Sequence, residues 1–319
     1  MLEDIVFKIN ETTRKNLSLL SDELCAVREQ RALELCDVAE GGAEYVSSFA
    51  NLGLNPIDAI SQLFFGLKFI EEENGYKASL GLSREVVSSW AANASNLDKA
   101  AFSELLNNSL KKRGVVIKES DFLTPQSFEN TFTYVRTPLS DEAYDVFTED
   151  IEGAKVTYSE NLRECVKRVV MGEVSFCLLP LEEKGGTRIG AVTELILGND
   201  LKINAVTPVF GYDGNAGMKY AMVSRGFSLP QAFDGDDRYI EILIEDGDSA
   251  ALLDFLSATV SFGHSIYRVN TQIFDKCNEE KTYYSVILRC GGQDLVSLLI
   301  YLTIFSDGYR PIGIFKNLE

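Results

Sequence analysis

The sequence predicts a multidomain α+β protein, with an all-helical N-terminal domain followed by two parts that contain β-strands. Two observations predict this class. Apolar residues recur at helical spacing through residues 1–120, whereas short β-branched or aromatic runs alternate with helical segments from Phe132 onward. With 319 residues, the chain is long enough for two or three domains.

Residues 1–120 are expected to form the helical domain. A long helix fits residues 2–40, where leucines recur at a loose spacing of three and four, and Gly41-Gly42 is expected to end it. Further helices are expected over residues 56–73, from Ser83 through Trp90, and over 97–113 with Gly114 as the stop. The segment VVIKESDFLTPQSFEN that follows is typical of a linker.

Residues 131–228 are expected to form an α/β lobe. The strand-like runs FTYVRT, AKVTY, VSFCLLP and KYAMVSR are separated by a helix that Ser140 can cap and by a second helix that ends at Gly172. Alternation of short strands and helices indicates a mainly parallel sheet whose two faces are covered. Residues 237–319 then follow the order β-α-β-β-α-β, with a hairpin around CNEEK, and this order predicts a ferredoxin-like domain.

The acidic composition argues against nucleic acid as a partner. The formal net charge is −18 and the isoelectric point is about 4.6, so the chain repels phosphate backbones and anionic membrane surfaces. The one basic cluster considered, Lys111-Lys112-Arg113, falls at the end of an expected helix, where cations complement the helix dipole. We therefore expect no contact with nucleic acid or membrane.

Residue usage also limits the chemistry and the location that we expect. His264 is the sole histidine, which disfavours a histidine-based zinc site or a Ser-His-Asp triad, and we expect neither metal nor cofactor. The six cysteines form no C-x-x-C pair, so we expect them to be small buried apolar residues in a reducing compartment. The first residues, MLEDIVFKINETTRK, are too charged for a signal peptide, and a cytoplasmic location is expected.

Residues 159–209, SENLRECVKRVVMGEVSFCLLPLEEKGGTRIGAVTELILGNDLKINAVTPV, resemble the prephenate dehydratase family without a gap. Gly172 and Pro180-Leu181-Glu182 stand where the family has a helix-ending glycine and the motif Pro-Ile-Glu-Asn-Ser/Thr. Upstream, YVRTPLSDEA resembles the family's first strand and loop, although both of its glycines are missing. The C-terminal β-α-β-β-α-β unit resembles the ACT domain that follows this lobe in the family, so the domain order agrees with the local match.

The resemblance implies positions for a ligand in the ACT-like part. The family binds phenylalanine there through Gly-Ala-Leu and Glu-Ser-Arg-Pro motifs, and both motifs are altered in this chain. The residues at these positions are Ala250, Ala251, Leu252, Asn270, Thr271 and Gln272. The N-terminal helices resemble a chorismate mutase domain only in Arg14, Arg31 and an Ile-x-x-Leu-Phe run, and arginines on a long helix are more often a solvated face.

The resemblance also implies where catalysis would occur and what has been lost. Glu182, Glu183, Lys184 and Lys219 are the candidate catalytic residues. Met218 stands where the family's Thr-Arg-Phe strand has threonine, and a thioether cannot donate a proton or a hydrogen bond. The second lobe of the family is missing as well, because LKINAVTPVF runs through GYDGNAG directly into the next strand.

Three hypotheses follow for the function. The first is a non-catalytic relative that serves as a binding or assembly module in aromatic amino-acid metabolism. The second is an active prephenate dehydratase/chorismate mutase of the P-protein type with a rebuilt site, and the third is a sensor of a small-molecule carboxylate or amino acid. We favour the first and third together, and we expect a homo-oligomer formed through the ACT-like domain or the first helix.

Overall fold

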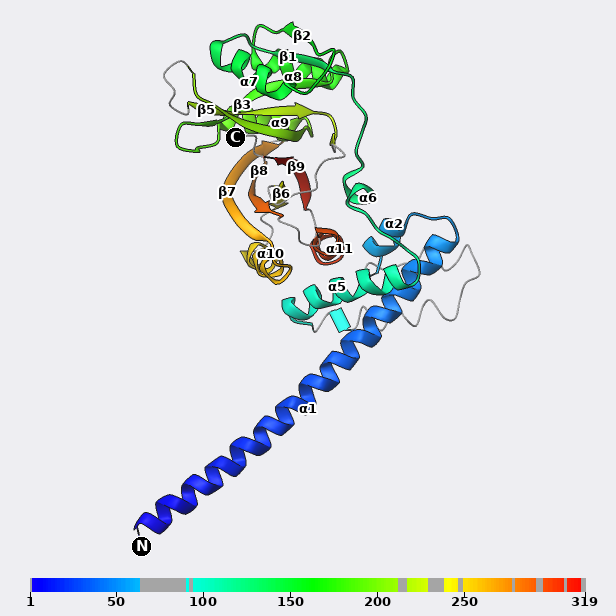
Figure 1. Cartoon of the computed structure of the whole chain (residues 1–319), viewed down its shortest axis with the longest axis vertical. Coiled ribbons are helices and arrows are strands. Elements are labelled where there is room, and N and C mark those ends of the chain that lie inside the picture. Colours follow the sequence, from blue (N-terminus) through cyan, green and yellow to red (C-terminus); the bar gives the residue numbers. More distant parts are fainter. Residues whose placement is uncertain are drawn as a thin grey trace. The chain divides into compact units, whose positions relative to one another are not determined.

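The structure is a computed structural model that divides the chain into two compact units, Met1–Val116 and Ile117–Glu319. The described residues are 2–63, 90–91, 94–211, 217–228, 238–245, 249–276, 279–290, 295–306 and 309–316. The helix expected over residues 56–73 is therefore described only as far as residue 63. Of the helix expected from Ser83 through Trp90, the structure describes only Trp90. The fold is α+β, with the helices of the first unit preceding the mixed unit, which contains the sheet (Figure 1).

The first unit is helical in its described part. Its helices are α1 (Leu2–Asn51), α2 (Pro56–Ser61) and α5 (Asn96–Lys112). The expected stop at Gly41-Gly42 is wrong, because α1 continues through both glycines to Asn51. A Cβ at Gly42 would make an ordinary contact of 3.4 Å with a methyl carbon of Leu106, so α1 continues through this position where it packs against α5.

Helix α5 agrees closely with its expected range of 97–113. Ser95 caps it through a capping box with Asp98, and Lys111 and Lys112 lie in its last turn, as expected for the basic cluster. The cysteine prediction is only partly right: Cys165, Cys177 and Cys290 are buried, but Cys25 and Cys36 are exposed on α1. Among the helices that the structure describes, none is both long enough and apolar enough to cross a membrane.

The second unit contains a nine-stranded sheet and six helices in its described part. In chain order these are α6 (Glu119–Leu123), β1 (Thr131–Tyr134), α7 (Pro138–Thr148), β2 (Lys155–Tyr158), α8 (Leu162–Met171), β3 (Phe176–Glu183), α9 (Gly190–Gly198), β4 (Lys202–Val209), β5 (Met218–Ser224), β6 (Arg238–Glu245), α10 (Ser249–Ser261), β7 (Ser265–Lys276), β8 (Glu279–Arg289), α11 (Leu295–Phe305) and β9 (Arg310–Lys316). The strand order is β2-β1-β3-β5-β4-β9-β6-β8-β7.

The lobe half of this sheet is less parallel than the sequence suggested. Strand β1 pairs in parallel with β2 and β3, but β5 lies between β3 and β4 and is antiparallel to both. The short connection after Val209 explains the correction, because a parallel crossover needs a dozen or more residues and a hairpin needs only a few. Gly217 N–H donates to Val209 O at 2.8 Å and closes this hairpin.

The helix ends of the lobe follow local capping chemistry. Helix α7 begins at Pro138 with Thr137 as its N-cap, so Ser140 is not the cap but the third helical residue, completing a capping box with Thr137. Helix α8 ends as expected at Gly172, which adopts a φ of 77°. The segment expected to be a linker contains α6, and Glu119 of this helix accepts two hydrogen bonds of 2.7 Å from Arg238.

The C-terminal half has the expected order of elements. Its strand order β9-β6-β8-β7 is antiparallel throughout, and β7 and β8 form the hairpin predicted around CNEEK. Strand β4 meets β9 in parallel at Ile203 and Gly313, where a Cβ on Gly313 would lie 3.2 Å from the Cβ of Ile203. Glycine therefore permits the close approach that joins the two halves into one sheet. The predicted domain boundary between 228 and 237 remains a prediction.

Candidate functional site

Glu182 lies at the centre of the candidate site and is buried. It is on β3, opposite Lys219 of β5 in the strand register, and a bulge between Pro180 and Glu182 interrupts the pairing there. Only 3% of Glu182 is exposed. A carboxylate at this depth requires charged or hydrogen-bonding partners, because an unpaired buried charge is costly.

Two arginines supply these partners to the Glu182 carboxylate. Arg268, on β7, donates from Nη1 to Glu182 Oε1 at 2.7 Å and to the carbonyl oxygen of Gly186 at 2.9 Å. Arg188 Nε lies 3.3 Å from the same Glu182 oxygen. Glu182 is thus held by one arginine from its own loop and by one from the C-terminal half.

Arg188 extends the cluster to a second buried carboxylate. Its Nη2 donates to Glu241 Oε2 at 2.6 Å, and Ser285 Oγ donates to the other oxygen of Glu241. Glu241 is on β6 and Ser285 is on β8, and each is 2% exposed. We call Glu182, Arg188, Glu241 and Arg268 the buried charge cluster; its two carboxylates and two guanidinium groups connect the lobe to the C-terminal half.

A tight loop after β3 positions Arg188. The loop closes through a hydrogen bond of 2.9 Å from Glu183 N–H to Thr187 O, and Glu182 forms an antiparallel bridge with Arg188. Gly186 has a φ of 85°, and a Cβ on it would lie 3.0 Å from Arg268 Nη2. Glycine is therefore required at 186 both by its backbone conformation and by the approach of Arg268.

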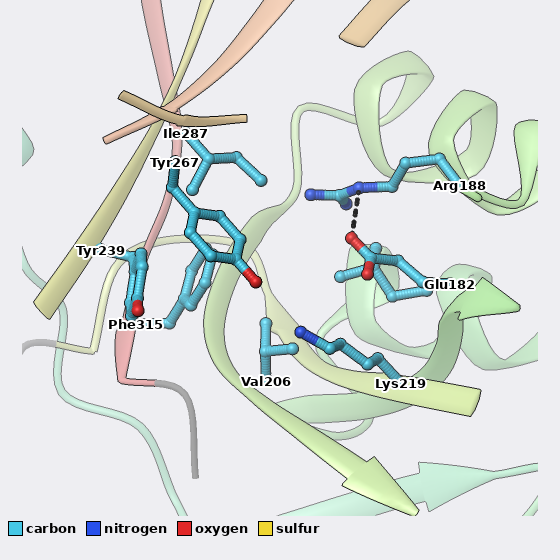
Figure 2. Close-up of a pocket in the computed structure, with 9 residues that line it drawn as sticks. Glu182, Arg188, Val206, Lys219, Tyr239, Tyr267, Ile287 and Phe315 are labelled. Carbon is cyan, nitrogen blue, oxygen red and sulfur yellow. Dashed lines mark ion pairs between the residues drawn. The ribbon is translucent and has the colours of Figure 1, made fainter. Parts of the chain in front are cut away.

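A small cavity opens beside the buried charge cluster (Figure 2). Figure 2 shows Lys219 pointing into it from β5, with the ring of Tyr267 on the opposite side. Its volume is about 20 Å³, which is room for roughly one water molecule. Among the described residues, Glu182 Oε2 and Arg188 Nε are buried without a hydrogen-bond partner, and Lys219 makes no ion pair.

The structure brings together only two of the four candidate catalytic residues. Glu182 and Lys219 line the cavity, whereas Glu183, the last residue of β3, and Lys184, in the loop that follows, are exposed and do not. Met218 packs against the aromatic cluster around Phe132, on a different set of contacts from the cavity. The arginines and Glu241 were missed from the sequence, although Glu241 in the middle of the apolar strand RYIEILIE was a visible signal.

The structure describes the side chains of only some of the residues predicted to bind a ligand in the C-terminal half. Asn270 on β7 has a buried Nδ2 with no hydrogen-bond partner among the described residues, while Thr271 is exposed and Leu252 half-buried. The side chains of Ala250, Ala251 and Gln272 lie outside the described residues. In the first unit, Arg14 is exposed and Arg31 is ion-paired with Asp98, so Arg31 has a structural partner.

A larger hollow of about 610 Å³ lies at the start of α7, where the lobe's first loop follows β1. Its charged lining residues are Arg136, Asp141, Glu142 and Asp145. Glu142 accepts hydrogen bonds from the backbone N–H groups of Phe210 and Gly211, at 2.8 and 3.0 Å. Three carboxylates beside one guanidinium group disfavour a dianionic ligand such as prephenate.

The described residues contain no group of three histidine, cysteine, aspartate or glutamate side chains that could share a metal ion. Burial, followed by the hydrogen bond to Asp141, raises the pKa of Tyr134 above its ordinary value, so this phenol beside the α7 hollow remains protonated near neutral pH.

Comparison with known proteins yields structural neighbours alone, since no family model matches the chain and no curated protein matches it significantly. A structure described as GqqA, a novel type of quorum quenching acylase, has 16% identity and a TM-score of 0.44, covering 59% of this chain and 95% of that one. Prephenate dehydratase from Streptococcus mutans has 15% identity and a TM-score of 0.45, covering 59% and 97%. Prephenate dehydratase from Arthrobacter aurescens in complex with L-Phe has 15% identity and a TM-score of 0.43, covering 59% and 90%.

Proposed function

We propose that the Ile117–Glu319 unit is a non-catalytic, small-molecule-binding relative of prephenate dehydratase, with its C-terminal half serving as an ACT-type binding module. The observation that carries the proposal is the state of Glu182. Its carboxylate is buried in the charge cluster, beside a cavity of about 20 Å³. Pockets for small organic ligands measure roughly 300–1,000 Å³, so this cavity is too small for prephenate.

The chemistry of the cavity supports the same proposal. Dehydration with decarboxylation needs a proton donor aimed at the departing hydroxyl group and a cleft that encloses the substrate. The carboxylate of Glu182 is instead ion-paired with Arg188 and Arg268, and these ion pairs connect elements of the sheet. Met218, in the place of the family's threonine, has no proton to donate.

We expect the purified full-length chain not to convert prephenate to phenylpyruvate. The measurement is the appearance of the product's ultraviolet absorbance on incubation with prephenate. Lys219→Met is the matched variant, because Lys219 lines the cavity without an ion-pair partner among the described residues, so its loss leaves the buried charge cluster intact. Turnover by the natural chain that Lys219→Met abolishes would show that the cavity is a working active site.

We expect an amino acid to stabilise the protein through Asn270. The probes are phenylalanine, tyrosine and tryptophan, each tested by thermal unfolding of the full chain. A ligand at about 100 times its dissociation constant adds roughly 2.7 kcal/mol to the free energy of unfolding. Because Asn270 Nδ2 is a buried donor without a partner in the part of the chain that the structure describes, Asn270→Ala should abolish this stabilisation.

Val269→Ala is the control for that experiment, since Val269 is the neighbouring residue on β7 and its side chain points to the opposite face of the strand. It should retain the full ligand-induced shift. If none of the three amino acids raises the unfolding temperature, the binding part of the proposal is wrong, whatever the result with prephenate.

The alternative is an active prephenate dehydratase with a rebuilt site, and the volume of the α7 hollow, in contrast to its charge, is the observation that favours it. At about 610 Å³ it is large enough for a small organic molecule. Arg136→Met would separate the two functions, because Arg136 is the single cation lining the described part of the hollow. Turnover lost in Arg136→Met but retained in Lys219→Met would place an active site there.

A further inference from the structure

The first half of α1 exposes an apolar face that the described residues leave uncovered. Every residue from 13 to 34 is exposed. Four large apolar side chains in this segment, Leu17, Leu20, Leu24 and Val27, are each between 50% and 62% exposed. Most helical stability in proteins comes from packing of an amphipathic face, so a helix that displays such a face is stabilised when the face packs against a partner.

The spacing of these four residues identifies the kind of packing. They follow one another at intervals of three, four and three, which are the a and d positions of a heptad repeat. We call them the α1 stripe. Leu19 and Leu33 are similarly exposed, at 60% and 67%, but both fall at position c, outside the stripe.

We propose that the α1 stripe pairs with the same stripe of a second copy of this chain, as a parallel two-stranded coiled coil. The charged residues beside the stripe select the partner and its direction. Glu23 occupies position g and Arg28 the following position e, so in a parallel pair each Glu23 faces Arg28 of the other copy. This pairing occurs twice, once on each side of the seam.

The opposite direction brings like charges together. In the antiparallel alignment that buries the same four apolar residues, Leu20 packs against Leu24 of the other copy. Glu23 then lies beside Glu23, and Arg14 lies beside Arg28. Positions e and g set orientation in coiled coils, so the charges favour the parallel pair.

Contacts of α1 within its own chain set the C-terminal limit of the proposed coiled coil. The next position a after the stripe is Arg31, which is ion-paired with Asp98 of the same chain. From Val38 onward α1 is buried against its own unit, with Val38 at 5% and Ala39 at 1% exposure. The α1 stripe belongs to the Met1–Val116 unit, so its pairing is independent of ligand binding by the Ile117–Glu319 unit.

The first test is the oligomeric state of the full chain by sedimentation equilibrium. We expect a reversible dimer, and Leu20→Glu/Leu24→Glu should raise its dissociation constant by roughly 100-fold or more, since four buried leucines are lost per dimer. Leu19→Glu/Leu33→Glu is the matched control, with the same added charge at equally exposed positions, and it should leave the dimer intact. Circular dichroism checks that both variants remain folded.

Two outcomes of this experiment would overturn the proposal. One is a natural chain that stays monomeric at every soluble concentration. The other is a dimer that survives Leu20→Glu/Leu24→Glu, which would indicate another surface, such as the outermost strand of the described sheet, β7.

The second test is the direction of the helices, measured by cross-linking. In a Cys25→Ser/Cys36→Ser/Cys277→Ser background, in which the remaining cysteines are buried, Leu20→Cys should form an intersubunit disulfide on mild oxidation, because position d meets position d in a parallel pair. The background chain without the new cysteine should not cross-link. A mixture of Leu20→Cys and Leu24→Cys chains that cross-links predominantly to each other would establish the antiparallel arrangement and contradict the proposal.

Discussion

Replacing Arg188 with methionine is expected to lower the free energy of unfolding of the Ile117–Glu319 unit by about 3–5 kcal/mol. The arginine side chain is 7% exposed and contacts both Glu182 and Glu241, which are 5% and 2% exposed in their side chains. Methionine fills much of the same volume but leaves Glu241 with Ser285 as its remaining side-chain partner. Removing one partner of a buried ion pair leaves an uncompensated charge, and urea unfolding measures the loss.

Arg163→Met is the control for this measurement, because Arg163 is exposed on α8 and belongs to the same unit. It should change the free energy of unfolding by less than about 0.5 kcal/mol. A combined Glu182→Met/Arg188→Met/Glu241→Met/Arg268→Met variant should recover most of the stability lost in Arg188→Met, since replacing a whole buried network by apolar residues is often neutral. If Arg188→Met is as stable as Arg163→Met, the buried charge cluster does not hold the two halves together.

The local elements were largely predictable from the sequence because their causes are local. Gly172 ends α8 through its left-handed backbone, and the order β6, α10, β7, β8, α11 and β9 follows from short runs of residues. The course of α1 through Gly41-Gly42 was not predictable in this way. Whether a helix ends at glycine or continues through it depends here on packing against α5, which lies far away in the sequence.

The buried charge cluster was hidden for the same reason. Arg188 and Glu241 are 53 residues apart, and Glu182 and Arg268 are 86 apart, so no spacing rule connects them. The prediction that included Glu183 and Lys184 relied on the motif Pro-Ile-Glu-Asn-Ser/Thr, whose last two positions these residues occupy. Glu183 points away from Glu182 because successive side chains of a strand point to opposite faces, and Lys184 is exposed in the loop after β3. Lys219 was found because the strand that carries it could be aligned with the family.

The second large effect is expected at alkaline pH, where the unit should lose stability steeply above about pH 9. Burial raises the pKa of Cys290 from 9.0 to about 12 and that of Tyr301 from 10.0 to about 12. Both groups are neutral when protonated, so the folded state retains protons that the unfolded chain has already released. Their contribution is fully present below the unfolded pKa values and is lost as the pH rises toward the folded ones.

The size of the effect follows from the number of protons involved. Each such group reduces the free energy of unfolding by about 1.4 kcal/mol per pH unit within its window. Burial also raises the pKa values of Cys177, Tyr220 and Tyr309, so several groups contribute in the same direction. Urea unfolding at a series of pH values between about 8 and 11 should therefore give midpoints that fall with increasing slope.

Cys290→Ala isolates one of these contributions. Cys290 is 2% exposed, so the variant is expected to lose some packing energy at every pH. Above about pH 9, however, its free energy of unfolding should fall less steeply than that of the natural chain, by about 1.4 kcal/mol per pH unit. If the free energies of unfolding of Cys290→Ala and of the natural chain instead change in parallel up to pH ~11, the Cys290 thiol ionises in the folded protein, and its burial does not raise its pKa.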